Sequence, residues 1–383
     1  MYYTRTIQSV TTTVFVPQYP TMTTSFDKID SSTVYECGIS HRINSRSISW
    51  NSIGTTLAMA GSDRSTKLYS MSDLMSNSSS SSSSQSQVRE LSNISGHADR
   101  VRFHPNQDSV LATASGNDSA VKLWDVRSSA AKASGTIDLT GSNSSNGSNV
   151  DISWSPIEQN LLVVTEKNGA VHVVDTRKLE NSNKTPTSAS AKKRPAFQKS
   201  FFLKPKIIDA CLFSPSGDHL VAATSAGGYG ELTVWNWTSE TSETSNYVYP
   251  AHTGPIYSAC FSPNGQTLAT GGGDALVGLW DVNTMVCAST MTRCDRFVRS
   301  VSFSFDSQIL ATSTEEATLD LANPHDGSLV GSVSMSSSSR RDRNAPGADE
   351  IAFHPKAHLL ACARCDSQNA SPLTIVKLTL GRQ

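Results

Sequence analysis

The sequence repeats one pattern seven times, and this repetition constrains the fold more than any other feature. Each repeat is marked by an aromatic residue that precedes a turn, an apolar segment and, in the best-preserved copies, a Trp-Asp pair. The seven aromatic residues are Trp50, Phe103, Trp154, Phe213, Phe261, Phe303 and Phe353. They lie 42 to 59 residues apart. Self-similarity at this period indicates one supersecondary unit that is repeated in an array.

The fifth repeat predicts four short antiparallel strands. Ile256–Phe261 is apolar and β-branched, and the Ser262–Gly265 segment after it has the Pro and Asn-Gly chemistry of a tight turn. Further strands are expected at Thr267–Thr270, Ala275–Trp280 and Thr284–Ser289. Four such strands form one propeller blade. The sequence therefore predicts an all-β fold, a seven-bladed propeller.

The two ends of the sequence predict how the ring closes. The third strand of the seventh repeat, Thr374–Leu378, is followed by only five residues, too few for a fourth strand. Ser32–Cys37 precedes the first repeat and has the composition of a strand. We expect this N-terminal strand to complete the last blade, which removes the exposed edges of an open array. Residues 1–31 are then a flexible tail, and residues 32–383 form the propeller.

Polar segments account for repeats that are longer than the usual blade. A propeller blade of four short strands needs roughly 40–45 residues. The excess falls in Ser-, Asn- and Gly-rich stretches, which we predict to be disordered loop insertions within blades. They lie near residues 71–87, 130–148, 180–195 and 334–347.

The second repeat is irregular. Six residues separate His97 from Phe103, where nine separate His41 from Trp50 and His252 from Phe261. Either the first strand of the second blade is shortened, or the sequence is imperfect at this point.

Composition excludes several classes of protein. The net charge is −1 and 17% of residues are charged, which argues against a surface built as a whole to bind nucleic acid. Seven scattered cysteines favour a reducing compartment. No apolar run approaches the roughly 18 residues that a membrane-spanning helix needs. We expect no membrane association.

The recurring polar residues resemble those of the WD40 family. In that family a His, a turn Asp, a strand Ser or Thr and a Trp form a hydrogen-bond network within a blade. The fullest set here is His252, Thr270, Asp274 and Trp280, while Asn168 and Glu316 replace the turn Asp in the third and sixth repeats. The resemblance implies a structural role and no catalytic one. The residues expected in such blade-structural positions are His41, Asp63, His97, Asp118, Trp124, Asp125, His252, Thr270, Asp274, Trp280 and Asp281.

Within the WD40 family, the order of motifs is similar to that of the THO complex subunit 3 family. The motifs are Leu268–Val282, Met285–Cys287 and Arg293–Ser304, and the resemblance extends roughly from Val34 to Leu380. It implies a non-enzymatic nuclear scaffold of the THO/TREX assembly, which couples transcription to mRNA packaging and export. The expected partners are other THO/TREX subunits, with mRNA contacted indirectly. Neither a cofactor nor a small-molecule substrate is implied.

A charged connection leads into the sixth repeat and is our candidate for partner binding. It contains Arg293, Asp295, Arg296 and Arg299. Loops on a rigid propeller often collect binding residues, although a solvated loop with blade-stabilising ion pairs would have the same composition. Two basic runs, Lys192–Pro195 and Arg340–Arg343, are candidates for nuclear-import or RNA-contacting patches, or serve only as solubilising charge.

No catalytic or metal-binding set emerges from the remaining motifs. Cys362 and Cys365 form a CxxC pair without a second pair, and neighbouring His354 and His358 lie in a predicted strand and turn, so we expect no zinc site. Gly271–Gly273 is a turn and does not cradle a phosphate, because no helix follows it. We expect no enzyme activity and no cofactor.

Two other scaffold functions stay open. Trp124–Arg127 matches the WDxR pattern by which some WD40 proteins bind the adaptor of a cullin-4 ubiquitin ligase, so a substrate receptor of that ligase is one alternative. The same residues are also an ordinary blade strand. The other alternative is a different nuclear or signalling WD40 scaffold, because this fold hosts many functions.

Overall fold

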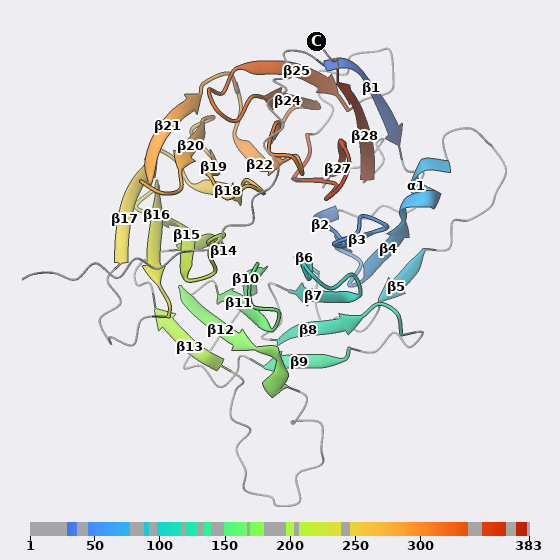
Figure 1. The fold of residues 1–383 in the computed structure, drawn as a ribbon, viewed down its shortest axis with the longest axis vertical. Helices are drawn as coiled ribbons and strands as arrows, with labels where there is room; N and C mark the ends of the chain where they lie inside the picture. Colours follow the sequence, from blue (N-terminus) through green and yellow to red (C-terminus); the bar gives the residue numbers. More distant parts are fainter. Residues whose placement is uncertain are drawn as a thin grey trace, which may run out of the picture.

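Seven four-stranded antiparallel sheets surround a central axis in the computed structural model (Figure 1). The fold class predicted from the sequence, a seven-bladed WD40 β-propeller, is confirmed. The structure describes residues 29–36, 45–76, 88–91, 98–115, 120–128, 133–138, 149–166, 169–179, 197–202, 207–238, 246–335, 347–364 and 373–380.

The first four blades follow one another along the chain. Blade one contains β2 (Ser45–Trp50), β3 (Thr56–Gly61), β4 (Thr66–Ser70) and β5 (Arg89–Leu91). Blade two contains β6 (Arg100–Phe103), β7 (Val110–Ala114), β8 (Ala120–Asp125) and β9 (Gly135–Asp138). Blade three contains β10 (Asn149–Trp154), β11 (Leu161–Glu166), β12 (Ala170–Asp175), η1 (Thr176–Lys178) and β13 (Phe197–Phe202). Blade four contains β14 (Ile207–Phe213), β15 (His219–Ala226), β16 (Tyr229–Asn236) and β17 (Asn246–His252).

The last three blades complete the ring. Blade five contains β18 (Ile256–Phe261), β19 (Thr267–Gly272), β20 (Val277–Asp281) and β21 (Val286–Met291). Blade six contains β22 (Val298–Phe303), β23 (Leu310–Thr314), β24 (Thr318–Ala322) and β25 (Leu329–Ser334). Blade seven contains β26 (Glu350–Phe353), β27 (Leu359–Ala363), β28 (Leu373–Leu380) and the N-terminal strand β1 (Ile29–Glu36).

Strand β1 closes the propeller, as the sequence predicted. It pairs antiparallel with β28, with Val34 opposite Val376, and supplies the outer strand of blade seven (Figure 1). The strand begins at Ile29, three residues before the predicted start at Ser32, and Cys37 lies outside the described residues. Because its first and last segments share one sheet, the ring cannot open without breaking this pairing.

Two of the predicted loop insertions contain regular structure. Residues 71–76 form the helix α1 (Met71–Ser76), because Leu74 is buried in the same cluster as Trp50 and Tyr69. Residues 135–138 form β9, the outer strand of blade two, whose Ile137 is buried in the core. The prediction of disorder was therefore wrong for these segments. Most of the remaining insertion residues lie outside the described residues, as does the tail up to residue 28.

Strand β6 explains the irregular second repeat. It has four residues, whereas β2 and β18 each have six. Phe103 still pairs with Leu111 and is buried beside Trp124. The first strand of blade two is therefore shortened, and the aromatic residue keeps its place in the core.

Hydrogen bonds between neighbouring innermost strands join the blades. At several seams, a side chain of one blade accepts a bond from a backbone amide of the next. The accepting atom and donating amide are Ser47 Oγ and Val101 (3.2 Å), Asp151 Oδ2 and Cys211 (3.2 Å), Ser258 Oγ and Val301 (3.2 Å), Ser300 Oγ and Ile351 (3.2 Å), and Glu350 Oε2 and Ile48 (2.8 Å). Each of these amides belongs to an edge strand of its sheet, and a buried amide without a partner would be costly.

Removal of the closing strand should destabilise the whole ring. A chain that begins at Ser45 lacks β1 and leaves β28 as an exposed edge, whereas a chain that begins at Ile29 keeps the pairing. We expect the shorter chain to unfold at a midpoint several degrees lower and to aggregate on heating. Thermal unfolding followed by circular dichroism compares the two. Equal midpoints would contradict closure by β1.

Candidate interaction sites

Blade five contains a buried four-residue network. The Trp280 indole donates to Thr270 Oγ1 at 3.0 Å, and this hydroxyl lies 2.8 Å from His252 Nε2. His252 Nδ1 lies 2.9 Å from Asp274 Oδ1, and all four side chains are at most 7% exposed. The hydroxyl accepts from the indole and donates to the imidazole, so that Nδ1–H donates to the carboxylate. Every polar atom of the set has a partner, which fixes the blade geometry.

Blade two contains one link of the same kind. The Trp124 indole donates to Thr113 Oγ1 at 2.9 Å, and both residues are buried. The other members that the sequence predicts for this blade, His97 and Asp118, lie outside the described residues, as does His41 of blade one. Asp63 of blade one accepts from the Ser65 amide at 3.3 Å and pairs with Lys67 at 2.9 Å.

The aspartates of the two Trp-Asp pairs hold turns and take no part in these networks. Asp125 accepts from the Arg127 guanidinium at 3.0 and 2.8 Å, and this hydrogen bonding lowers the pKa of Asp125. Asp281 accepts from the Thr284 amide at 2.8 Å, and that bond lowers its pKa. Arg127, the last residue of the WDxR pattern, is 75% exposed in its side chain while folded back on Asp125.

Blade three has a buried network that the sequence analysis missed. His172 Nε2 lies 2.8 Å from Glu166 Oε1, and its Nδ1 lies 2.9 Å from Ser200 Oγ. Glu166 and His172 are at most 1% exposed. The predicted substitute in this blade, Asn168, is outside the described residues. The sequence did contain a signal for this network. His172 interrupts the apolar third strand of the blade, where a buried strand otherwise carries apolar residues.

Arg299 faces the central channel, apart from the rest of the predicted partner-binding set. It pairs with Glu315 at 2.7 Å and lies over the Tyr257 ring at 5.5 Å. The channel also contains Arg102, which pairs with Glu350 at 2.9 Å and approaches Asp151 at 4.0 Å. Burial disfavours the Arg102 cation, but the two carboxylates outweigh burial and raise its pKa. The channel arginines are therefore largely neutralised by acids.

Arg293 and Asp295 line a cavity of ≈ 180 Å³ in blade six. The remaining lining residues are Cys294, Thr312, Thr314, Glu316, Thr318 and Asp320. Arg296 is exposed, and Phe297 is 44% exposed with its ring centroid 6.3 Å from that of Tyr257 in blade five. The structure thus brings together Arg293 and Asp295 with Glu316, the residue that replaces the turn Asp in the sixth repeat.

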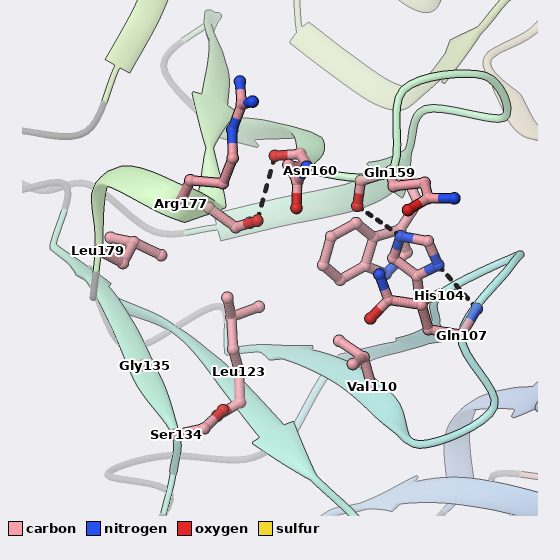
Figure 2. A pocket seen from close by; sticks show the side chains of 12 residues that line it. His104, Gln107, Val110, Leu123, Ser134, Gly135, Gln159, Asn160, Arg177 and Leu179 are labelled. Carbon is pink, nitrogen blue, oxygen red and sulfur yellow. Dashed lines mark hydrogen bonds between the residues drawn. The ribbon is translucent and has the colours of Figure 1, made fainter.

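A second cavity of ≈ 180 Å³ lies at the seam of blades two and three (Figure 2). Its wall includes His104, whose Nε2–H donates to the Gln159 carbonyl at 2.6 Å and whose Nδ1 accepts from the Gln107 amide at 3.0 Å. Burial lowers the pKa of His104. The ring must stay neutral to make both bonds, because only a neutral imidazole has an accepting nitrogen.

His354 repeats this arrangement at the seam of blades seven and one. Its Nε2–H donates to the Gly54 carbonyl at 2.9 Å, and its Nδ1 accepts from the Lys356 amide at 3.1 Å. Burial lowers its pKa also. Gly54 has a φ of +80°, and a Cβ there would lie 2.0 Å from His354 Nε2. Only glycine permits this contact.

Other candidate chemistry has little support in the described part of the chain. Cys362 is fully buried, burial raises the pKa of its thiol to about 12, and Cys365 falls outside that part. In the described ranges, no group of three or more His, Cys, Asp or Glu side chains is placed to hold a metal ion. No helix among the described residues is long and apolar enough to cross a membrane.

Family models match parts of the ring. The family described as WD domain, G-beta repeat matches residues 88–125 and 243–281, which contain the Trp124-Asp125 and Trp280-Asp281 pairs. An uncharacterised protein domain, DUF2415, matches residues 151–185 in blade three. Together with the seven blades, these matches define the chain as a WD40-repeat β-propeller.

Comparison with curated proteins narrows this class. The chain is 26% identical to THO complex subunit 3 of Arabidopsis thaliana over 330 residues, which cover 85% of this chain and 88% of the relative. It is 28% identical to WD repeat-containing protein AAC3 of Dictyostelium discoideum, over 76% of this chain and 59% of the relative. It is 26% identical to mitotic checkpoint protein bub-3 of Caenorhabditis elegans, over 58% and 61%. The predicted resemblance to THO complex subunit 3 is confirmed: the chain is a WD40-repeat protein that is similar to that subunit over most of its length.

Loss of the central hydroxyl in blade five should destabilise the fold. Thr270→Val keeps the shape but leaves the Trp280 indole N–H and His252 Nε2 without their shared hydroxyl partner. We expect a loss of about 2–4 kcal/mol in unfolding free energy. Urea denaturation measures it, with the exposed Thr290→Val of the same blade as the matched control. If the two variants were equally stable, the network would not stabilise the fold and the prediction would be wrong.

Low pH should weaken the two blade seams that contain His104 and His354. The pKa values of His104 and His354 are lowered in the folded protein, so the unfolded chain binds more protons below its ordinary histidine pKa of roughly 6.5. Their contribution to stability is therefore complete above that pH and declines as the pH falls below it. Urea denaturation at pH 8.0 and pH 5.5 should show the protein to be less stable at the lower pH.

Histidine variants test whether the two seams cause this loss of stability at low pH. The double variant His104→Gln, His354→Gln cannot titrate at these positions and should have a smaller stability difference between the two pH values. His219→Gln changes a partly exposed histidine outside the seams and should keep the full difference. If the double variant keeps it as well, another group is responsible.

Proposed function

We propose that this chain is a non-enzymatic scaffold subunit of a THO/TREX-type nuclear assembly that couples transcription to mRNA packaging and export. The observation that carries this proposal is the extent of the similarity to THO complex subunit 3, which spans 85% of this chain and 88% of the relative. A span of 330 residues is as long as most of the propeller. A similarity of repeats alone would match individual blades.

Shorter matches illustrate this contrast. Periodic tryptophan protein 2 homolog of Dictyostelium discoideum is 36% identical, but over 20% of this chain and 8% of that protein. Such a match reports the shared blade pattern. Similarity over most of the chain extends beyond one or two blades, and the loops and edges of WD40 proteins otherwise vary with their partners.

The expected partner-binding residues lie together in part on the described surface. Arg293 and Asp295 line the blade-six cavity, and the exposed Arg296 and Phe297 follow them in the sequence. Aromatic and arginine side chains are enriched where proteins bind one another. We therefore assign partner binding to this edge of blade six, and leave Arg299 to the channel network.

The charge distribution favours indirect contact with mRNA. Arg102 and Arg299 in the channel are each paired with carboxylates, and the net charge of the chain is −1. Binding of nucleic acid depends on cations that are available to phosphates. Partner subunits would then hold the RNA.

Purification of the tagged chain from nuclear extract tests the proposal. Quantitative mass spectrometry should find the other THO subunits at stoichiometric levels, and ribonuclease treatment should leave them bound. Absence of THO subunits would overturn the proposal. Loss of the subunits after ribonuclease would overturn the indirect contact with mRNA.

The exposed WDxR arginine supports one alternative, a substrate receptor of a cullin-4 ligase. Arg177 repeats the geometry in the next blade, where it pairs with Asp175 at 2.7 Å and is 66% exposed. Under this alternative, the purification recovers the ligase adaptor, and Arg127→Ala abolishes its recovery. Under the scaffold proposal, Arg127→Ala leaves the recovered subunits unchanged.

A further inference from the structure

Blades five and six correspond residue by residue at a spacing of 42 positions. Strand β18 begins at Ile256 and β22 at Val298, and the aromatic anchors are Phe261 and Phe303. The sheet registers agree with this spacing. Leu268 pairs with Trp280 in blade five, and Leu310 pairs with Ala322 in blade six.

This correspondence identifies what blade six has in place of the blade-five network. Thr270 corresponds to Thr312, which is retained and buried. His252 corresponds to Cys294, Asp274 to Glu316 and Trp280 to Ala322. Both ring side chains are thus replaced by small ones. The ≈ 180 Å³ cavity of blade six is lined by Cys294, Thr312 and Glu316, which stand at the positions of His252, Thr270 and Asp274.

A further replacement makes this cavity acidic. Gly278 of blade five corresponds to Asp320. A Cβ at Gly278 would lie 2.8 Å from Trp280 Nε1 and 2.9 Å from Thr270 Oγ1, so the complete network excludes any side chain there. Without the indole, blade six accommodates a carboxylate. Its Oδ1 accepts from Ser332 Oγ at 2.5 Å.

The cavity has unbalanced negative charge. Its wall carries the carboxylates of Asp295, Glu316 and Asp320 but one cation, Arg293. Within the described ranges, no ion pair joins any of the three carboxylates to a cation. Burial, together with Asp320 and Asp295, raises the pKa of Cys294 to about 11, so its thiol stays neutral. Asp295 and Glu316 are exposed and Asp320 is partly buried, so this excess of negative charge faces the open side of the cavity, where it would attract a cation.

We propose that the blade-six cavity receives an arginine side chain from a protein partner. A guanidinium is planar, as are the rings missing from this space, and its five N–H donors suit several carboxylates and the Thr312 and Thr314 hydroxyls. The proposal rests on the proposed scaffold function in requiring a protein partner.

Cys294 provides a local reporter for the test. It lines the cavity, whereas Cys287 is exposed on the outer strand β21 of blade five. Alkylation of the purified full chain by iodoacetamide is followed at both cysteines by mass spectrometry. The probes are two nine-residue peptide libraries with random flanks, one with a central arginine and the other with its neutral analogue citrulline.

We expect the arginine-centred library to slow alkylation of Cys294 at least fivefold, and the citrulline-centred library to have little effect. The rate at Cys287 should stay the same with both. Glu316→Gln combined with Asp320→Asn keeps Cys294 and the cavity volume but should remove the protection. Equal protection by both libraries, or protection that persists in this double variant, would overturn the proposal.

A second variant separates loss of binding from loss of fold. Cys294→His, Glu316→Asp, Asp320→Gly and Ala322→Trp together restore the blade-five set in blade six. We expect this protein to unfold at or above the wild-type midpoint, and to bind the fluorescent arginine and citrulline libraries equally in anisotropy measurements. A persistent preference for arginine would place its binding site elsewhere and overturn the proposal.

The chain itself offers a competing occupant, the Arg340–Arg343 segment. If replacement of its three arginines by serine speeds alkylation of Cys294 when no peptide is present, that segment fills the cavity and the partner proposal fails. The peptide experiment uses the isolated chain, so its outcome and that of the nuclear purification are independent.

Discussion

The ring depends on hydrogen bonds that side chains of five blades accept from backbone amides of the neighbouring blade. Ser47, Asp151, Ser258, Ser300 and Glu350 accept from amides of the neighbouring innermost strand. A propeller has little chain crossing between its blades, so these bonds and the apolar clusters that bridge the seams set the position of every blade. Strand β1 adds the remaining constraint, because it joins the two ends of the chain in one sheet. A rigid ring results, and its rim can vary without loss of the fold.

Much of this architecture could be predicted from the sequence. The seven aromatic anchors lie in the core or at the seams, as with Trp50, whose indole donates to the Ala352 carbonyl of blade seven at 3.1 Å. The closing strand could be predicted because the seventh repeat has too few residues for a fourth strand of its own. Helix α1 and strand β9 were missed because serine- and glycine-rich composition obscures short elements whose order comes from one buried side chain, Leu74 or Ile137. Local composition cannot report such tertiary packing.

The candidate site was predictable only in part, for a related reason. Sequence repeats identify the residues that recur, and so they identified the blade-five network. They do not report what replaces it. The buried Glu166–His172 pair of blade three is a different solution to the same need for satisfied polar groups. Blade six has lost the rings and gained Asp320. At positions where a blade lacks the repeated residues, the fold no longer determines which side chain is present. Contact with a partner can determine it instead.

The most direct test is hydrogen–deuterium exchange, measured on the free chain and on the nuclear assembly that is purified with it. It asks whether blade six, which lacks the hydrogen-bond network of blade five, serves as the binding surface. Protection upon assembly should be largest in the Arg293–Arg299 connection and in the Thr312–Asp320 segment of blade six. The intact blade-five network should exchange equally in both states. Protection confined to blades two and three, with blade six unchanged, would contradict the assignment of the interface to blade six.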